Sequence, residues 1–213
     1  FPNQDFASVK ESGKFLTYQT PAMSTLYMGL NTEIEPFGNK LVRQAMNYAV
    51  DKQAIADAIY FGFGAPARGP LSPVIWGFDP TREPAYSYNP DKARELLKEA
   101  GFPNGFDMTI FSDNRTERRS AAELIQAFLA EVGIRAKVEL MEWSALLSTS
   151  AKGIGGAFML GWTGTGDADG GMTPVYHTAN IGSSNRFRYS IPALDALLEK
   201  GAATLDQAER RKI

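Results

Sequence analysis

Hydrophobic and polar residues follow two different periods along this chain, and segments with one period alternate with segments that have the other. Apolar residues recur at helical spacing between residues 41 and 49, whereas 134–140 alternates apolar with charged residues, as a half-buried strand does. Applied throughout, these patterns predict strands at 15–20, 25–31, 106–111, 134–140 and 157–160, and helices at 41–49, 52–60, 90–100, 117–132, 143–152, 192–200 and from 205 onward. Strands that alternate with helices predict an α/β fold, a layered sheet flanked by helices.

Local signals support several of these boundaries. Asp51 is placed to cap the helix 52–60, and Asn89-Pro90-Asp91 combines a capping residue with proline in the first helical turn. Gly101 and Gly133 end two helices. Glycine and proline recur between residues 61 and 80, which predicts an irregular segment there.

Composition excludes several functional classes. The chain has 213 residues and a net charge of −2, so nothing points to a nucleic-acid partner. Cysteine is absent, which excludes disulfides, cysteine nucleophiles and thiolate metal sites. No apolar run approaches the roughly 18 residues of a membrane span. The chain opens on Phe1-Pro2 without an initiator Met, so we expect a processed chain or a part of a longer one.

The segment after the last predicted strand has the composition of a recognition loop. Glycines in 161–171 let the backbone turn sharply and approach a ligand, while hydroxyls and carboxylates supply hydrogen-bonding groups. The candidate contacts are Trp162, Thr163, Thr165, Asp167 and Asp169. The alternative is an ordinary surface loop in which Trp162 fills the core.

Two arginines are further candidates for ligand contact. Arg115 follows the strand 106–111, at the end of a strand where α/β sheets tend to bind ligands, and could hold a carboxylate through two parallel hydrogen bonds. Arg186 lies among aromatic residues in Asn185-Arg186-Phe187-Arg188-Tyr189. The alternative for both is a solvated surface arginine, which the nearby Arg118 and Arg119 favour in the case of Arg115.

Catalytic signatures are missing from the chain. There is no nucleophile elbow, phosphate-binding loop or zinc-protease motif, and the single histidine, His177, fits a solvated position. Asp167 and Asp169 resemble the start of a calcium loop, but Gly171 and Thr178 stand where further ligands are required. A small α/β hydrolase or isomerase that uses Asp167 and Asp169 as acid and base stays an alternative, as does a protein-interaction module.

Several short motifs together resemble the family 5 extracytoplasmic solute-binding proteins, the peptide, nickel and glutathione receptors of ABC importers. The motifs are Leu30-Asn31-Thr32, Pro36-Phe37, Val42-Arg43-Gln44-Ala45, Tyr48-Ala49-Val50-Asp51-Lys52, Tyr88-Asn89-Pro90-Asp91-Lys92-Ala93, Leu96-Leu97-Lys98-Glu99-Ala100-Gly101, Val132-Gly133-Ile134, Met141-Glu142-Trp143, Gly161-Trp162 and Asp195-Ala196-Leu197-Leu198. They cover the chain from about residue 15 onward.

The resemblance implies a periplasmic-binding-protein-like lobe. Residues 1–30 would be the end of the first lobe and hinge, and 31–213 an incomplete second lobe without its C-terminal strands. Such a protein would be a periplasmic or lipid-anchored monomer without cofactor or catalysis. It would close on a peptide or a glutathione-like ligand bearing a carboxylate, and deliver it to an ABC permease.

The resemblance also identifies a departure from the peptide receptors. Those proteins place an aspartate three residues after the tryptophan of the Gly-Trp loop, where it pairs with the peptide amino terminus. Thr165 stands at that position here. Asp167 or Asp169 is the candidate substitute, and the loop is closer to that of the glutathione receptors.

Overall fold

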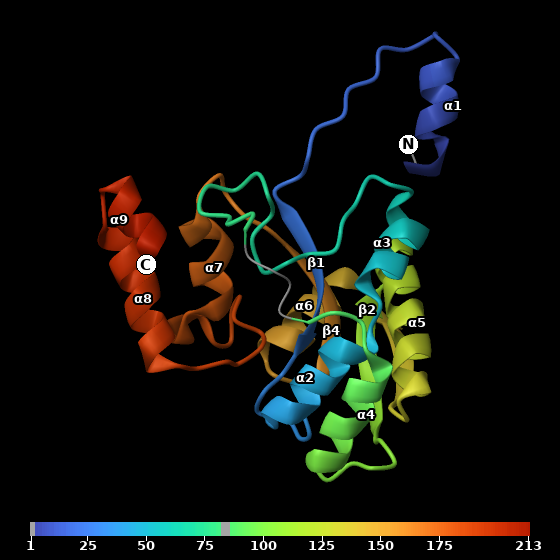
Figure 1. The fold of residues 1–213 in the computed structure, drawn as a ribbon, viewed down its shortest axis with the longest axis vertical. Helices are drawn as coiled ribbons and strands as arrows, with labels where there is room; N and C mark the ends of the chain where they lie inside the picture. Colours follow the sequence, from blue (N-terminus) through green and yellow to red (C-terminus); the bar gives the residue numbers. More distant parts are fainter. Residues whose placement is uncertain (1–2, 82–85) are drawn as a thin grey trace.

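A four-stranded mixed sheet forms the centre of the computed structural model, which describes residues 3–81 and 86–213 (Figure 1). The strands are β1 (Ser24–Leu30), β2 (Asp107–Asp113), β3 (Arg135–Met141) and β4 (Ala157–Thr163), and their order across the sheet is β1-β4-β2-β3. β2 runs parallel to both β3 and β4, whereas β1 runs antiparallel to β4. The α/β layered fold predicted from the sequence is therefore confirmed.

The helices follow the chain in a simple order. They are α1 (Phe6–Glu11), α2 (Lys40–Ala49), α3 (Lys52–Tyr60), α4 (Pro90–Glu99), α5 (Thr116–Glu131), α6 (Trp143–Ala151), α7 (Ala168–Tyr176), α8 (Pro192–Ala203) and α9 (Gln207–Lys212), with 3-10 turns at Asn3–Asp5 and Thr178–Asn180. The capping predictions are confirmed. The Asp51 side chain accepts hydrogen bonds from two backbone N–H groups of α3, and that of Asn89 accepts one from α4.

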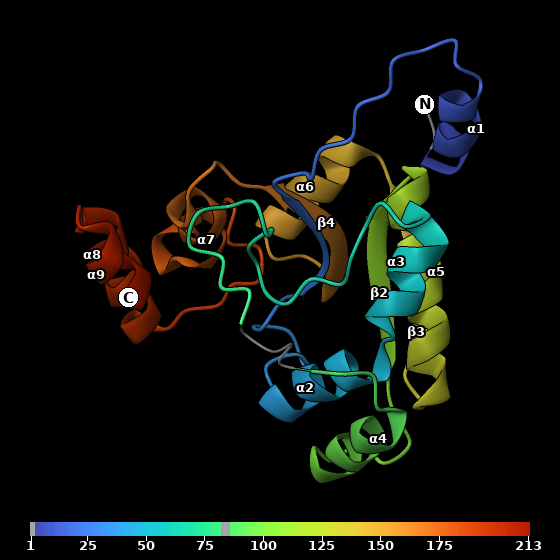
Figure 2. The same ribbon diagram turned by 45° about the horizontal axis from the view of Figure 1, so that its top comes forward.

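One face of the sheet carries the larger core. Helices α2, α3, α4 and α5 pack there, and their apolar stripes meet the inward-facing residues of β2 and β4. Buried residues of this core include Val42, Ala45, Met46, Ala93, Leu97, Ile110, Ala121, Ile125, Leu129, Ala157 and Met159. Figures 1 and 2 show α3 and α5 on the far side of the molecule from α8 and α9, which lie beside α7.

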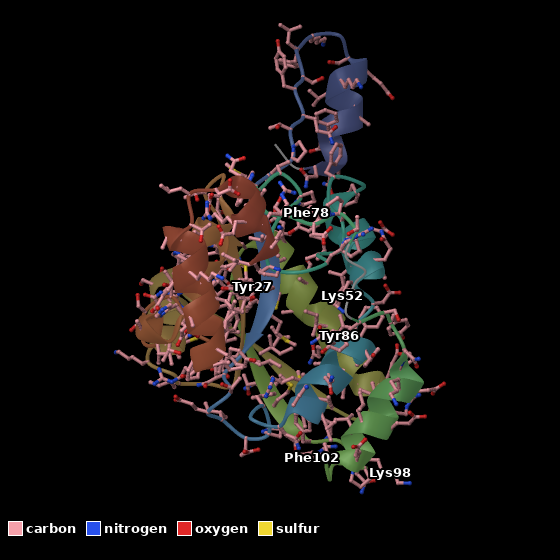
Figure 3. All side chains as sticks on the ribbon, turned by 60° about the vertical axis from the view of Figure 1, so that its left-hand side comes forward. Tyr27, Lys52, Phe78, Tyr86, Lys98 and Phe102 are labelled. Carbon is pink, nitrogen blue, oxygen red and sulfur yellow. The ribbon has the colours of Figure 1, made fainter. Side chains whose placement is uncertain are left out.

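The other face carries a smaller aromatic core under α6. Alternation along β4 sends Phe158 and Leu160 to this side, where they pack with Leu146 of α6. Tyr27 and Phe187 close the cluster, with their ring centroids 5.3 Å apart. Figure 3 shows Tyr27 in the middle of the molecule, well away from Lys98 and Phe102 at the end of α4.

Two sequence predictions are wrong. Residues 15–20 form no strand; they follow α1 in a segment that extends away from the sheet (Figures 1 and 2) and pair with none of the four strands in the described part of the chain. The predicted loop 161–171 is much shorter. β4 continues to Thr163 because β1 pairs with it as far as Ser24, and α7 already begins at Ala168 because Asp167 caps it.

Two helices escaped the sequence analysis, α1 and α7. Gly170, Gly171 and Pro174 lie inside α7 and lower its helical propensity, so the pattern there is typical of a loop. Over the ranges 3–81 and 86–213, no helix is long and apolar enough to cross a membrane.

Candidate functional site

The carboxyl ends of β2, β3 and β4 meet at one edge of the sheet, because these strands are parallel. This is the edge at which α/β sheets usually bind ligands. Three arginines lie at this edge of the sheet or beside it. We call Arg115, Arg118 and Arg186, with Asp113, Tyr27 and Trp143, the arginine edge.

Arg115 and Arg118 share one carboxylate and one aromatic ring. The Oδ2 atom of Asp113 accepts from Arg115 Nε at 2.8 Å and from Arg118 Nη1 at 3.0 Å. Both guanidinium groups lie over the Trp143 ring, 4.2 and 4.5 Å from its centroid. One buried carboxylate and one π-face therefore hold two cations close together.

Arg118 is the more enclosed of the two. Its side chain is 12% exposed against 50% for Arg115, and burial lowers its pKa while Asp113 opposes that shift. A Cβ on Gly161 would lie 3.7 Å from Arg118 Nη2, so the guanidinium reaches over β4.

Tyr27 links this pair to the third arginine. Burial raises the pKa of Tyr27 to about 12, and the nearby charges of Arg186 and then Arg118 oppose the rise. Arg186 itself is half-buried. Burial lowers its pKa, and its Nε atom is buried without a hydrogen-bond partner among the described residues.

The segment that carries Arg186 is fixed by its neighbours. The buried Asn185 amide donates to the backbone oxygens of Tyr176, His177 and Tyr189, at 3.4, 3.2 and 2.8 Å. The backbone N–H of Thr32 donates to Phe187 O at 2.9 Å, which ties the segment to the end of β1. The position of Arg186 is therefore set by contacts on both sides of it.

The predicted contacts after β4 lie in a different setting. Trp162 Nε1 donates to Gly170 O at 2.9 Å, so the indole is fixed against the first turn of α7. Thr163 is exposed and its hydroxyl donates to Ser24 Oγ at 3.2 Å. Thr165 is exposed, with its side chain against Gly170.

Asp167 is engaged by other parts of this chain. Its two carboxylate oxygens accept from Arg210 Nη1 and Nη2 at 2.7 and 2.6 Å, and Oδ1 also accepts from the Asp169 backbone N–H at 2.9 Å. The Arg210 hydrogen bonds hold the pKa of Asp167 below its usual range. Asp169 accepts from Thr173 Oγ1 at 2.6 Å. The two carboxylates therefore serve the start of α7 rather than facing each other.

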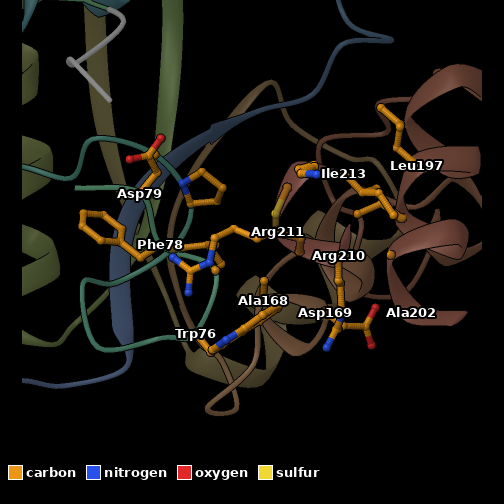
Figure 4. A pocket seen from close by; sticks show the side chains of 18 of the residues that line it. Trp76, Phe78, Asp79, Ala168, Asp169, Leu197, Ala202, Arg210, Arg211 and Ile213 are labelled. Carbon is orange, nitrogen blue, oxygen red and sulfur yellow. The ribbon is translucent and has the colours of Figure 1, made fainter. Parts of the chain in front are cut away.

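A cavity of about 410 Å³ lies between the segment 68–79 and helices α7 to α9 (Figure 4). Its lining includes Asp169, Arg210 and Arg211 beside mostly apolar side chains. Both arginines lie over the Trp76 ring, at 5.0 and 5.5 Å from its centroid. Asp169 is the one predicted site residue that lines this space.

His177 does not occupy the solvated position that its sequence context indicated. Its side chain is 17% exposed, with Nε2 3.1 Å from Glu199 Oε1, and Nδ1 accepts from the Ala179 N–H at 3.1 Å. The histidine thus joins the end of α7 to α8.

The structure brings Arg115 and Arg186 into one electropositive neighbourhood, whereas Asp167 is drawn into an ion pair elsewhere. Arg115 and Arg118 share the single carboxylate of Asp113 and Arg186 pairs with none among the described residues, so the positive charge that remains suits the binding of an anion. No group of three or more His, Asp and Glu side chains that could hold a metal occurs in the part of the chain that the structure describes. Sequence analysis missed Tyr27, Asp113 and Trp143 as site residues and did not single out Arg118. The available signal for Asp113 was a carboxylate directly after the predicted strand 106–111.

Comparison with known proteins gives a consistent result. The family model of bacterial extracellular solute-binding proteins, family 5 (middle region), matches residues 1–183. Heme-binding protein A of Haemophilus influenzae is 38% identical over 221 residues, covering 100% of this chain and 40% of the relative. A glutathione-binding protein of Pectobacterium atrosepticum is 33% identical, covering 100% of this chain and 43% of the relative.

The fold matches a solved structure equally well. The ABC transporter-associated periplasmic binding protein DppA from Helicobacter pylori, in complex with the peptide STSA, superposes with a TM-score of 0.93 at 33% identity. The match covers 100% of this chain and 42% of that protein. The chain therefore spans about two fifths of the length of these relatives.

Proposed function

Because the chain belongs to the family 5 bacterial extracellular solute-binding proteins, we propose that it forms part of a receptor for a carboxylate-bearing solute. The receptor would work outside the cytoplasm, in the periplasm or anchored by a lipid, and deliver its ligand to an ABC permease. This family binds solutes and is not enzymatic. That membership speaks against the hydrolase alternative, and so does the Asp167–Arg210 ion pair.

The arginine edge is the observation that carries this proposal. Arg115 and Arg118 share the single carboxylate of Asp113, and the buried Nε of Arg186 has no acceptor in the described structure. Unused guanidinium donors beside aromatic walls suit a carboxylate, which can accept two parallel hydrogen bonds from one arginine. We therefore propose the edge as this chain's contribution to the binding cleft.

The loop after β4 contributes the remaining proposed contacts. Trp162 would provide an apolar wall, and Thr163, Thr165 and Asp169 the polar groups, while Asp167 would hold the loop in place through its ion pair with Arg210. A ligand ammonium at Asp167 would have to compete with Arg210, which occupies both carboxylate oxygens. Thr165 also stands where the peptide receptors have the aspartate that pairs with the peptide amino terminus. Both observations support a ligand held chiefly through its negative charge.

A peptide or a glutathione-like molecule is the proposed ligand. The relatives named for glutathione binding and for a bound peptide support this size and charge. We propose that residues 31–213 form most of the second lobe and 1–30 the end of the first, although β1 pairs with β4 within one sheet. Ligand would be captured as the two lobes of a monomeric protein close.

Calorimetric titration of the full-length protein tests the proposal. Glutathione, a dipeptide and an oligopeptide would be titrated into wild type and into Arg115→Gln and Arg118→Gln variants. We expect micromolar binding of at least one ligand, weakened about tenfold or more in the variants, since a charged hydrogen bond contributes about 1.5–3 kcal/mol. Arg135→Gln is the control, because Arg135 pairs with Asp107 at the opposite ends of β2 and β3. Unchanged affinity in both edge variants would contradict the proposal.

A further inference from the structure

Arg186 is a partly buried cation whose charge is not balanced by any ion pair in the described ranges. A buried donor without an acceptor costs about 1–3 kcal/mol, and more when the group is charged. Folded chains rarely keep such a group without a use for it. A ligand that supplied the missing acceptor would remove this cost on binding.

The neighbouring Arg188 shows what a structural arginine looks like in the same segment. Its Nε forms an ion pair with Glu33, and its Nη1 donates to Ala151 O at 3.5 Å. Arg188 is thus neutralised and fastens the segment to the rest of the fold. Arg186, two residues earlier, has an unused donor although Asn185 fixes the backbone beside it.

The surroundings of Arg186 also differ from those of the other two edge arginines. Arg115 and Arg118 already have the Asp113 carboxylate and the Trp143 ring, on the β2 side of the sheet. Arg186 lies on the β1 side, near Tyr27 and next to Phe187 in the chain. The arginine edge therefore contains two cationic groups on different segments, and one is without a protein counter-ion.

Resting on the proposed function, we infer that the ligand carries two anionic groups, one bound by Arg115 and Arg118 and the other by Arg186. Arg186 then determines specificity for dianionic ligands, such as peptides with an acidic side chain or molecules with two carboxylates. A neutral carbonyl would satisfy the Nε–H but would leave the charge unbalanced, so a carboxylate is the better partner.

The test compares ligands that differ by one charge in the full-length protein. Ala-Glu has two carboxylates, and Ala-Gln has one and nearly the same shape. Glutathione also has two carboxylates, and its glycyl monoethyl ester has one and an added ethyl group. Each pair is titrated calorimetrically into wild type, Arg186→Gln and Arg119→Gln. The last is the matched control, because Arg119 is an exposed α5 arginine that pairs with Glu123.

We expect wild type to bind the dianionic member of at least one pair tenfold or more tightly. Arg186→Gln should reduce that preference to less than threefold while the monoanionic member keeps its affinity within threefold. Arg119→Gln should retain the full preference. Thermal unfolding of Arg186→Gln should show no loss of stability, since an unsatisfied buried charge is removed.

Three results would overturn the inference. Equal binding of both members by wild type, or a preference that survives in Arg186→Gln, would remove Arg186 as the second anion contact and leave the proposed receptor function intact. Absence of binding by every ligand would overturn the proposed function and this inference together.

Discussion

The ion pair between Asp167 and Arg210 gives a prediction that separates a structural role from ligand binding. Asp167 caps α7 through the Asp169 N–H and holds Arg210 of α9 through two hydrogen bonds. Replacing Asp167 with Ala removes the cap and the ion pair, whereas Asn keeps a capping oxygen and removes the charge. We expect both variants to lower the free energy of unfolding, by different amounts.

The magnitudes follow from the exposure of the two groups. The Asp167 and Arg210 side chains are 40% and 21% exposed, so solvent screens the pair and it contributes about 0.5–1 kcal/mol. Loss of an N-cap costs about 1 kcal/mol. Asp167→Asn should therefore lose about 0.5–1 kcal/mol and Asp167→Ala about 1.5–2 kcal/mol. Arg210→Gln should match Asp167→Asn, with about 0.5 kcal/mol more for its contact with Trp76.

Urea unfolding of the full-length protein and ligand titration supply the two readouts. The double variant Asp167→Asn with Arg210→Gln should lose less than the sum of the single losses, because both remove the same pair. Ligand affinity should stay within threefold of wild type in all three single variants. A loss of affinity of tenfold or more in Asp167→Ala, with affinity intact in Arg210→Gln, would refute this reasoning and place the carboxylate on the ligand.

The same pair predicts a dependence on pH. The pKa of Asp167 is held below its usual range, so the carboxylate takes up a proton at lower pH in the folded protein than in the unfolded chain. The stabilisation is therefore fully present above about pH 4, near the ordinary aspartate pKa, and is lost as pH falls further. Wild type and Asp167→Asn should differ in stability at neutral pH and converge below that value.

Two further substitutions test the fold and the placement of Arg186. Gly105→Ala should destabilise the protein by more than about 3 kcal/mol, because Gly105 has φ +69° and a Cβ there would lie 1.8 Å from Gly133 O. Urea unfolding measures this change, and a loss below about 1 kcal/mol would contradict the prediction. Asn185→Ala should cost about 2–3 kcal/mol, since it leaves backbone oxygens of a buried segment without donors. It should also weaken binding of the dianionic ligand, and calorimetry that finds unchanged affinity would show that Asn185 does not position Arg186.

Periodicity was a sufficient guide to the sheet and its flanking helices, because burial of one face imposes it. The predicted alternation holds from Ile134 to Glu139, because Ala136 and Val138 pack against the larger core while the other face of β3 is exposed, but Leu140 is exposed as well. α7 could not be predicted from periodicity, because its glycines and proline lower helical propensity, and the Asp167 cap and the contacts with neighbouring elements sustain it. The capping signal at Asp167 was present in the sequence, but two aspartates in a glycine-rich stretch are equally typical of a binding loop.

The candidate site was only partly predictable for a different reason. Arg115 could be placed at the end of a strand by local pattern, but the partners that separate Arg186 from Arg188 come from distant segments. Glu33, 155 residues away in sequence, neutralises Arg188, whereas Arg186 keeps its unused donor. Which of two neighbouring arginines is available to a ligand depends on tertiary contacts, and a single sequence carries no direct record of them.

The order of the strands has a last consequence for the shape of the cleft. β1 and β4 pair along seven residues, and so do β2 and β3, but β2 and β4 are joined by only two residue pairs, Ile110 with Ala157 and Phe111 with Phe158. Beyond this short seam the backbone ladder between the two halves stops. Tyr27 of β1, Phe111 of β2 and Phe158 of β4 pack in one cluster with Phe187 across this seam, and we expect that cluster to set the spacing between Arg186 and the Arg115–Arg118 pair. Changes of ring size among those residues can adjust the length of an accepted ligand while both strand pairs stay in register.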